Sequence, residues 1–340
     1  MKAMFTTLSC LAVCSVSFSQ ADSSAVYFQK ALAEKTAKRY LVASGYLDKA
    51  VEINPKFEEA YLQDAYINLE MRKTDKAIEL FLKVHEINPG NTVAIKELTE
   101  LYYSYHQYDK AIEFAQKCKD CENSERIIAM CSYQQEDYAT AITGLQNVLV
   151  KNPNDAEASY TIGRSYLELE QENKAIPYYK KAVDGDPSKT MWAYELGIVY
   201  YNLEDYGNAI TMLNKALDNG YQHSADIDEN LGYAYIYHGD FSKGETLLLA
   251  LLAKRPGDKE MLRNMADAYY KAKRYDQSLT YCQKLMEMDM KDAKALYQAG
   301  LCFQKKGDTD KGQGMCDKAI ELDPSLASLK QKISQDSFGL

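Results

Sequence analysis

The sequence predicts an all-α protein built as an α-solenoid of about nine helix-turn-helix repeats. The first observation is a spacing of 34 residues between Pro55 and Pro89, which a second pair of prolines further along the chain repeats. The second observation is a pair of apolar signatures that recurs within this period. The third is composition, because 7 prolines and 17 glycines in 340 residues favour long helices over many short strands.

The spaced prolines predict where each repeat ends. Each follows a polar residue, as Pro55 follows Asn54. A residue before proline is pushed out of the helical region, so the dipeptide stops a helix. Proline itself is tolerated in a turn or in the first turn of the next helix. The gap from Pro89 to Pro153 is 64 residues, so one repeat there is about four residues short of two full periods.

The two apolar signatures predict a pair of helices in each repeat. One signature is a large residue, a small residue and an aromatic residue, as in Leu196, Gly197 and Tyr200. The large and aromatic residues are four apart and share a helix face, while the small residue lets a neighbouring helix approach closely. About a dozen positions later comes a small residue before a branched one, as in Ala209 and Ile210. We therefore expect two antiparallel helices that cross at small residues.

This pattern resembles the tetratricopeptide repeat family, whose large-small-x-x-aromatic, Ala, aromatic and Pro positions fall at these residues. The resemblance covers roughly residues 24–326 and implies a right-handed solenoid of stacked helix pairs, because one pair cannot bury its apolar face alone. Residues 327–340 are expected to form a capping helix and tail. The predicted repeats are 24–57, 58–91, 92–121, 122–155, 156–189, 190–224, 225–258, 259–292 and 293–326.

Residues 1–19 have the order of a secretory signal peptide. Lys2 is followed by an uncharged run of apolar and small residues, with serines just before a cut at Gln20. The pattern predicts a periplasmic or otherwise exported protein of a bacterium. A cytosolic, apolar N-terminus is the alternative. A lipid anchor at Cys14 is a third reading, although Val13 is large for the position before a lipidated cysteine.

Charge and motifs argue against several classes of function. The formal net charge is −9, and without residues 1–19 it becomes −10, from 39 basic and 49 acidic residues. An acidic chain without a long basic run is a poor binder of nucleic acid. The four histidines fit no metal-site spacing, and no phosphate-binding loop or nucleophile–base pair stands out. The sequence therefore predicts a protein that is not an enzyme and holds no metal or cofactor.

The resemblance also indicates a partner-binding groove. In the family, positions 5, 9 and 12 of each repeat line the concave surface, and tyrosine dominates these positions here. Its rigid ring and hydroxyl suit peptide recognition, although many of the 28 tyrosines could instead pack between helices. No asparagine stands at position 9, so the family's clamp for a C-terminal carboxylate is absent. The groove candidates are Tyr66, Tyr103, Tyr133, Tyr160, Arg164, Tyr194, Ile198, Tyr201, Tyr233, Tyr270 and Tyr297.

Three cysteines gather where the third repeat is short. They are Cys118, Cys121 and Cys131, and a disulfide among them would cross-link this junction in an oxidising compartment. A Cys-x-x-Cys redox or metal pair is an alternative, but no second pair stands at zinc spacing. Buried free thiols at packing positions are the other alternative.

The function predicted from these features is a protein–protein interaction scaffold. It is expected to bind a partner peptide or helix in its groove, and the resemblance suggests a place in cell-envelope assembly or secretion. The alternative is an accessory or regulatory subunit of an envelope enzyme complex. The predicted partners are other proteins and no nucleic acid, with membrane contact only through a partner or through a lipid anchor at Cys14.

Overall fold

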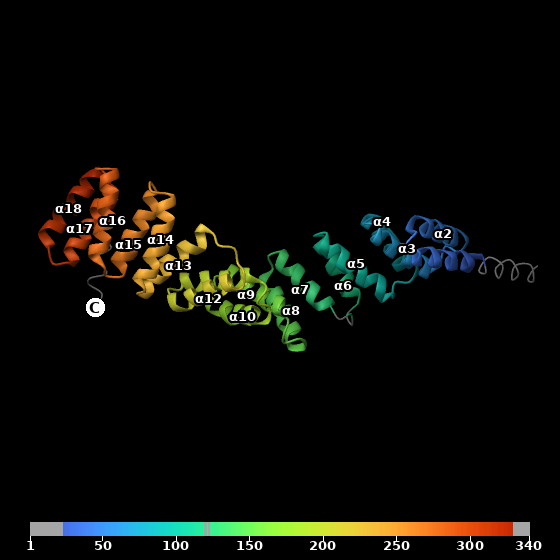
Figure 1. Ribbon diagram of the computed structural model, residues 1–340. Coiled ribbons are helices and arrows are strands. Elements are labelled where there is room, and N and C mark those ends of the chain that lie inside the picture. The colour runs from blue at the N-terminus through green and yellow to red at the C-terminus, as the bar shows by residue number, and fades with distance from the viewer. Residues whose placement is uncertain (1–22, 119–120, 122, 329–340) are drawn as a thin grey trace, which may run out of the picture. The chain divides into compact units, whose positions relative to one another are not determined.

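The computed structural model describes residues 23–118, 121 and 123–328 (Figure 1). Every regular element in these ranges is a helix, as the repeat pattern predicts. None of the described helices is long and apolar enough to cross a membrane. The predicted signal peptide and most of the predicted C-terminal tail lie outside the described residues.

The helices follow one another with short turns. In order they are residues 23–36, α2 (Tyr40–Ile53), α3 (Glu58–Glu70), α4 (Thr74–Ile87), α5 (Thr92–Ser104), α6 (Tyr108–Lys117), α7 (Ser124–Gln134), α8 (Tyr138–Lys151), α9 (Ala156–Glu168), α10 (Glu172–Gly185), α11 (Thr190–Asn202), α12 (Tyr206–Asp218), α13 (Ala225–His238), α14 (Phe241–Lys254), α15 (Lys259–Lys271), α16 (Tyr275–Met288), α17 (Ala293–Lys305), α18 (Thr309–Leu322) and the 3₁₀ turn η1 (Pro324–Leu326).

The chain divides into two compact units, residues 1–175 and 176–340, with the division inside α10. In both units, helices pack as hairpins of a first or A helix and a second or B helix. Each of the pairs α3–α4, α5–α6 and α7–α8 in the first unit, and α11–α12 through α17–α18 in the second, is such a hairpin. B helices such as α4, α6, α12 and α16 then pack on the next A helix. Each unit is therefore a stretch of helical solenoid.

Small residues let the paired helices cross closely, as the sequence predicts. A Cβ atom added at Gly197 of α11 would lie 2.7 Å from the Leu213 side chain of α12. At Gly300 of α17 it would lie 2.6 Å from the Cys316 sulfur of α18. Such contacts are too short for real side chains, so a larger residue would force these helices apart.

The turn between A and B helices places one residue in the left-handed conformation in every predicted repeat. In the sixth repeat, Glu204 has φ of 59°, its N–H donates to the Tyr201 carbonyl, and the Asp205 N–H donates to the Tyr200 carbonyl. This is a Schellman cap, for which glycine is the usual residue. The fifteenth position of each repeat is the one affected: Lys38, Arg72, His106, Glu136, Glu170, Glu204, Gly239, Lys273 and Gly307.

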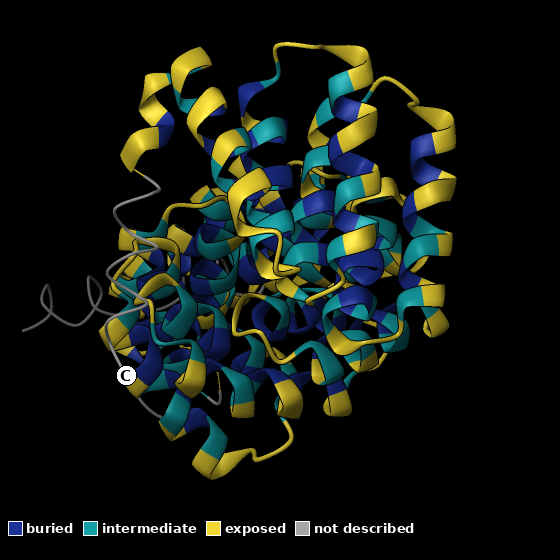
Figure 2. Ribbon diagram, turned by 90° about the vertical axis from the view of Figure 1, so that its left-hand side faces the viewer, coloured by how far each residue is buried: buried dark blue, intermediate teal, exposed yellow. Residues whose placement is uncertain are grey.

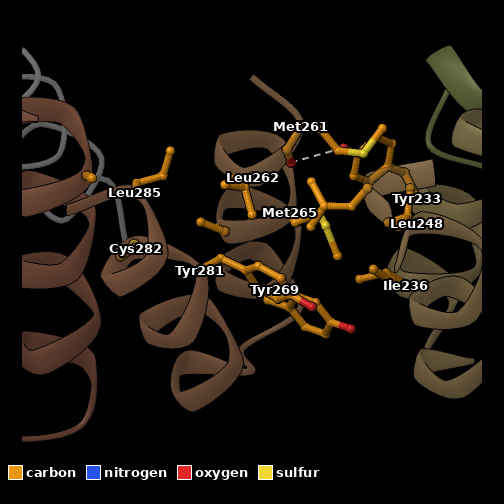
Figure 3. Packing of buried hydrophobic residues seen from close by; sticks show 14 of the residues in the cluster. Tyr233, Ile236, Leu248, Met261, Leu262, Met265, Tyr269, Tyr281, Cys282 and Leu285 are labelled. Carbon is orange, nitrogen blue, oxygen red and sulfur yellow. Dashed lines mark hydrogen bonds between the residues drawn. The ribbon is translucent and has the colours of Figure 1, made fainter. Parts of the chain in front are cut away.

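Buried residues line the sides of helices that face their neighbours, whereas turns and helix ends are mostly exposed (Figure 2). In the second unit the largest core cluster centres on Met265, Tyr269 and Tyr281 (Figure 3). The rings of Tyr269 and Tyr281 stack with centroids 5.6 Å apart. At the C-terminal end, Leu326 of η1 is buried against Tyr297 and covers the last hairpin.

Candidate partner-binding site

The predicted groove residues differ in how far they are exposed. In the first unit, four tyrosines and Arg164 are half-buried: Tyr66, Tyr103, Tyr133 and Tyr160. In the second unit, Tyr194, Ile198, Tyr201 and Tyr270 are half-buried as well. These side chains keep part of their surface available to a partner.

Two of the predicted groove residues lie in the core. Tyr233 is 6% exposed, and its hydroxyl donates to the Met261 carbonyl of the next A helix at 3.5 Å (Figure 3). Tyr297 is 4% exposed, because Leu326 and Cys316 pack against it. The prediction that these two side chains line an open groove fails for one physical reason. A following element covers each side chain, and the position of a residue within its own repeat does not show what the following element covers.

Many groove tyrosines also pair with a tyrosine at the start of the B helix. The ring at position 12 contacts the ring at position 17 across the left-handed turn. The sequence signal for these pairs, two tyrosines five residues apart, was not among the predictions. The pairs and their centroid distances are Tyr103–Tyr108 (6.1 Å), Tyr133–Tyr138 (5.8 Å), Tyr201–Tyr206 (5.6 Å) and Tyr270–Tyr275 (5.6 Å).

The phenol groups of Tyr66 and Tyr270 are neutral hydrogen-bonding groups at physiological pH. Burial, followed by the nearby carboxylate of Glu97, raises the pKa of Tyr66 to about 12. The Tyr66 hydroxyl donates to Glu97 at 3.0 Å. Burial likewise raises the pKa of Tyr270 to about 12. Tyr194 stacks on Tyr221 with centroids 4.8 Å apart, so one face of its ring is covered.

Arginines of the inner positions are engaged within the chain. Arg164 pairs with Glu168 at 3.1 Å. At position 5 of the fourth repeat, Arg126 contacts Asp155 at 2.9 Å and also Glu157. Asp155 caps α9 by accepting from the Ala158 N–H at 2.9 Å. The guanidinium groups are therefore neutralised by carboxylates of this chain.

The eighth repeat contains the same contact. Arg263, again at position 5, pairs with Asp292 at 3.0 Å, and Asp292 caps α17 through the Ala295 N–H. We call these two contacts the Arg–Asp latches. Each joins a residue of one A helix to the cap of the next, 29 residues later. The sequence shows the 29-residue spacing between each arginine and its aspartate. Only the stacking of consecutive repeats brings the two side chains into contact.

A cleft of about 160 Å³ lies between the A helices α5 and α7 of the first unit. Its α5 wall includes Lys96, Thr99 and Glu100, of which Lys96 and Glu100 occupy positions 5 and 9 of the third repeat. Its other wall includes Cys121 and Ile127. The cleft lies in the repeat with the shortest of the described B helices, because α6 has 10 residues where the others have 13 or 14.

The clustered cysteines adopt two different states. Cys118 and Cys121 are joined by a disulfide with an S–S distance of 1.99 Å and a Cα–Cα distance of 5.4 Å. Cys131 is a buried free thiol, and burial raises its pKa to about 11. Among the described residues, no group of histidine, cysteine and acidic side chains could hold a metal ion.

Comparison with known proteins identifies the repeat. A family model described as "Tetratricopeptide repeat" matches residues 229–293, and a second with the same description matches residues 293–326. A model described as "Anaphase-promoting complex, cyclosome, subunit 3" matches residues 134–216.

Curated relatives are similar over part of the chain. The DnaJ protein P58IPK homolog A of Oryza sativa is 24% identical over 185 residues, which are 49% of this chain and 39% of the rice protein. The Arabidopsis thaliana homolog is 26% identical over 49% of this chain and 38% of its own length. Anaphase-promoting complex subunit 3 of Schizosaccharomyces pombe is 25% identical over 42% of this chain and 22% of its own length. The chain thus spans about two fifths of the first two relatives.

Two solved structures are similar to part of this chain. YrrB, described as a TPR protein with an unusual peptide-binding site, is 25% identical, covers 55% of this chain and 97% of its own, and has a TM-score of 0.39. MamA from Desulfovibrio magneticus is 22% identical over 50% of this chain and 96% of its own, with a TM-score of 0.40. The two matching family models and the helix pairs described above identify this chain as a member of the tetratricopeptide repeat family and as a protein-interaction scaffold.

Proposed function

We propose that this scaffold is non-catalytic and exported, and that it holds a partner peptide or helix on the inner face of its A helices in a bacterial cell envelope. By inner face we mean positions 5, 9 and 12 of the repeats. Export is supported by the signal-peptide pattern of residues 1–19. The disulfide between Cys118 and Cys121 agrees with an oxidising compartment.

The observation that carries the proposal is the α5–α7 cleft. It lies between consecutive A helices, and two inner-face positions, Lys96 and Glu100, form part of its wall. Both signs of charge are thus present beside the apolar side chains of Val93 and Ile127. An apolar pocket with a few polar groups around it is the usual form of a site that receives a partner side chain.

The half-exposed tyrosines extend this surface. Because one side of Tyr103 or Tyr133 rests on its partner ring, the ring is held in place before a partner arrives. A rigid aromatic side chain loses little conformational entropy on binding, which favours its use at interfaces. Tyr66, at position 9 of the second repeat, is half-buried, and its hydroxyl donates a hydrogen bond to Glu97.

The binding proposal is tested by affinity capture of the full chain from its native envelope, followed by mass spectrometry. We expect the double variant Lys96→Glu and Glu100→Lys to lose the partner, because it exchanges the two charges of the cleft wall. The matched control exchanges an exposed pair on the B helix α4, Lys76→Glu with Glu79→Lys. Recovery of the same partners by both variants would contradict the proposal.

Export is tested on the same material. The N-terminus of the protein recovered from its native cell should begin at Gln20, and intact mass should show no lipid. A chain that keeps Met1 and stays with the cytosolic fraction would contradict export and leave the cleft experiment unaffected.

A further inference from the structure

The two sulfurs of the disulfide have different surroundings. Cys118 is 8% exposed and belongs to the core cluster that also contains Phe114 and Ile127. Cys121 is half-buried and forms part of the wall of the α5–α7 cleft. Of the two cysteines, Cys121 lines the cleft and Cys118 does not.

The connection between α6 and α7 is also held by hydrogen bonds. The Cys118 carbonyl accepts from the Cys121 N–H at 3.2 Å and from the Ser124 hydroxyl at 2.8 Å. The Ser124 N–H in turn donates to the Cys121 carbonyl at 3.0 Å. None of these hydrogen bonds involves a sulfur atom, so the connection is held by more than the sulfur–sulfur bond.

The third cysteine does not compete for the bond. Cys131 is fully buried, and burial raises its pKa to about 11, so its thiol is protonated at neutral pH. A protonated thiol is a poor nucleophile, because the thiolate is the attacking species in thiol–disulfide exchange. Attack of Cys131 on the disulfide is therefore disfavoured.

We propose that the Cys118–Cys121 disulfide is a thiol–disulfide exchange site that opens into the α5–α7 cleft and accepts the thiol of a cysteine-containing peptide or protein. The incoming thiolate attacks the Cys121 Sγ, and a mixed disulfide forms. The bond to the Cys118 Sγ breaks, its electron pair stays on that sulfur, and the resulting thiolate takes a proton from water. No separate oxidant is needed.

Release runs through the same atoms. The Cys118 thiolate attacks the Cys121 Sγ, restores the internal disulfide and expels the partner as a thiolate. The site would thus hold a partner covalently and reversibly. This chemistry goes beyond the proposed binding of a partner and does not depend on the identity of that partner.

The first experiment compares the two thiols one at a time in the full chain. The Cys118→Ser variant leaves Cys121 as a free thiol, and the Cys121→Ser variant leaves Cys118 as a free thiol. Both variants are treated with 5,5′-dithiobis(2-nitrobenzoate). We expect the thiol of Cys121 to react at least about tenfold faster than that of Cys118, because reactivity follows access. Equal rates, or reaction only in denaturant, would overturn the proposal.

Controls separate access from unfolding. Both variants lack the same disulfide, so their thermal transitions should be lowered equally relative to the wild-type chain, and a difference in reaction rate between them then reports access and not unfolding. The adduct formed when the oxidised wild-type chain reacts with reduced glutathione, trapped in acid, should map to Cys121. An adduct on Cys118 would also overturn the proposal.

The second experiment tests the route through the cleft. Lys96 shares the cleft with Cys121, so its charge should favour the anionic thiol glutathione over the neutral thiol 2-mercaptoethanol. We expect Lys96→Glu to slow cleavage of the disulfide by glutathione about threefold and to leave cleavage by 2-mercaptoethanol unchanged. The same change in both rates, or in neither, would place the attack outside the cleft.

Discussion

The third and sixth repeats show how one repeat pattern can either fill its interior or leave room. In the sixth, Gly197 meets Leu213 across a tight helix crossing, and the B helix α12 has 13 residues. In the third, the same eighth position holds Thr99, and α6 has 10 residues. The sixth repeat packs tightly at this crossing, whereas the third has the cleft at this position and contains the disulfide. The proposed site thus lies in the repeat with the short B helix.

The junctions differ as well. In the fourth and eighth repeats, position 5 is an arginine that latches the cap of the next A helix. In the third repeat, position 5 is Lys96, and the last residue of the predicted repeat is Cys121. Both line the cleft in place of an Arg–Asp latch. At the short junction, the cleft and the proposed exchange site therefore occupy the place that the Arg–Asp contact has in the fourth and eighth repeats.

The largest expected effect comes from exchanging the eighth-position residues. Gly197→Thr should lower the free energy of unfolding by about 3 kcal/mol, because its Cβ would lie 2.7 Å from Leu213. The reciprocal Thr99→Gly should cost about 1 kcal/mol, through helix propensity and lost packing. Urea unfolding followed by circular dichroism measures both. Equal losses would mean that the two crossings are equally tight.

Removing a latch should have the next largest effect. Asp155→Ala removes both a helix cap and the partner of Arg126, and should cost about 2 kcal/mol. Asp292→Ala should cost a similar amount in the second unit. Lys96→Met is the contrasting variant and should change stability by less than about 0.5 kcal/mol. Urea titrations at one pH compare the three, and a large loss for the lysine variant would show a latch there too.

Removing the disulfide should lower the free energy of unfolding by no more than removing an Arg–Asp latch does. The double variant Cys118→Ser with Cys121→Ser releases a loop of four residues, for which the chain-entropy estimate is about 2 kcal/mol. Native hydrogen bonds of Ser124 remain, so hydrogen exchange should rise in α6 and α7 and stay unchanged in α3. A protein that loses all its helices on this change would contradict a local role for the bond.

The smallest expected effect is a gain in stability. Glu204→Gly should raise the free energy of unfolding by about 1 kcal/mol, because a side chain at a φ of 59° is strained. The matched change in the opposite direction, Gly239→Ala, should cost about the same at a φ of 99°. Thermal unfolding of both variants measures the pair. A loss on Glu204→Gly would show that its side chain makes a contact that outweighs the strain.

The features that recur within each repeat could be predicted from the sequence, whereas the contacts between neighbouring repeats were seen only in the structure. The helix pairs, the close crossing at Gly197 and the short third repeat follow from spacing and residue size, which are properties of one repeat. The burial of Tyr233 under the next A helix could not be predicted in that way. The contact of Arg126 with Asp155 and the cleft beside α5 also depend on how far one hairpin is shifted against the next.

The left-handed turn residues have a consequence for the smallest fragment that can fold. Seven of the nine are not glycine, so most hairpins contain a local conformational strain. A solitary hairpin would retain this strain and lose the apolar contacts with its neighbours that offset it. Truncated chains should therefore lose helicity steeply below a minimum number of repeats. The strain energy of the turns thus helps to set the smallest number of repeats that can fold, independently of how many repeats a partner contacts.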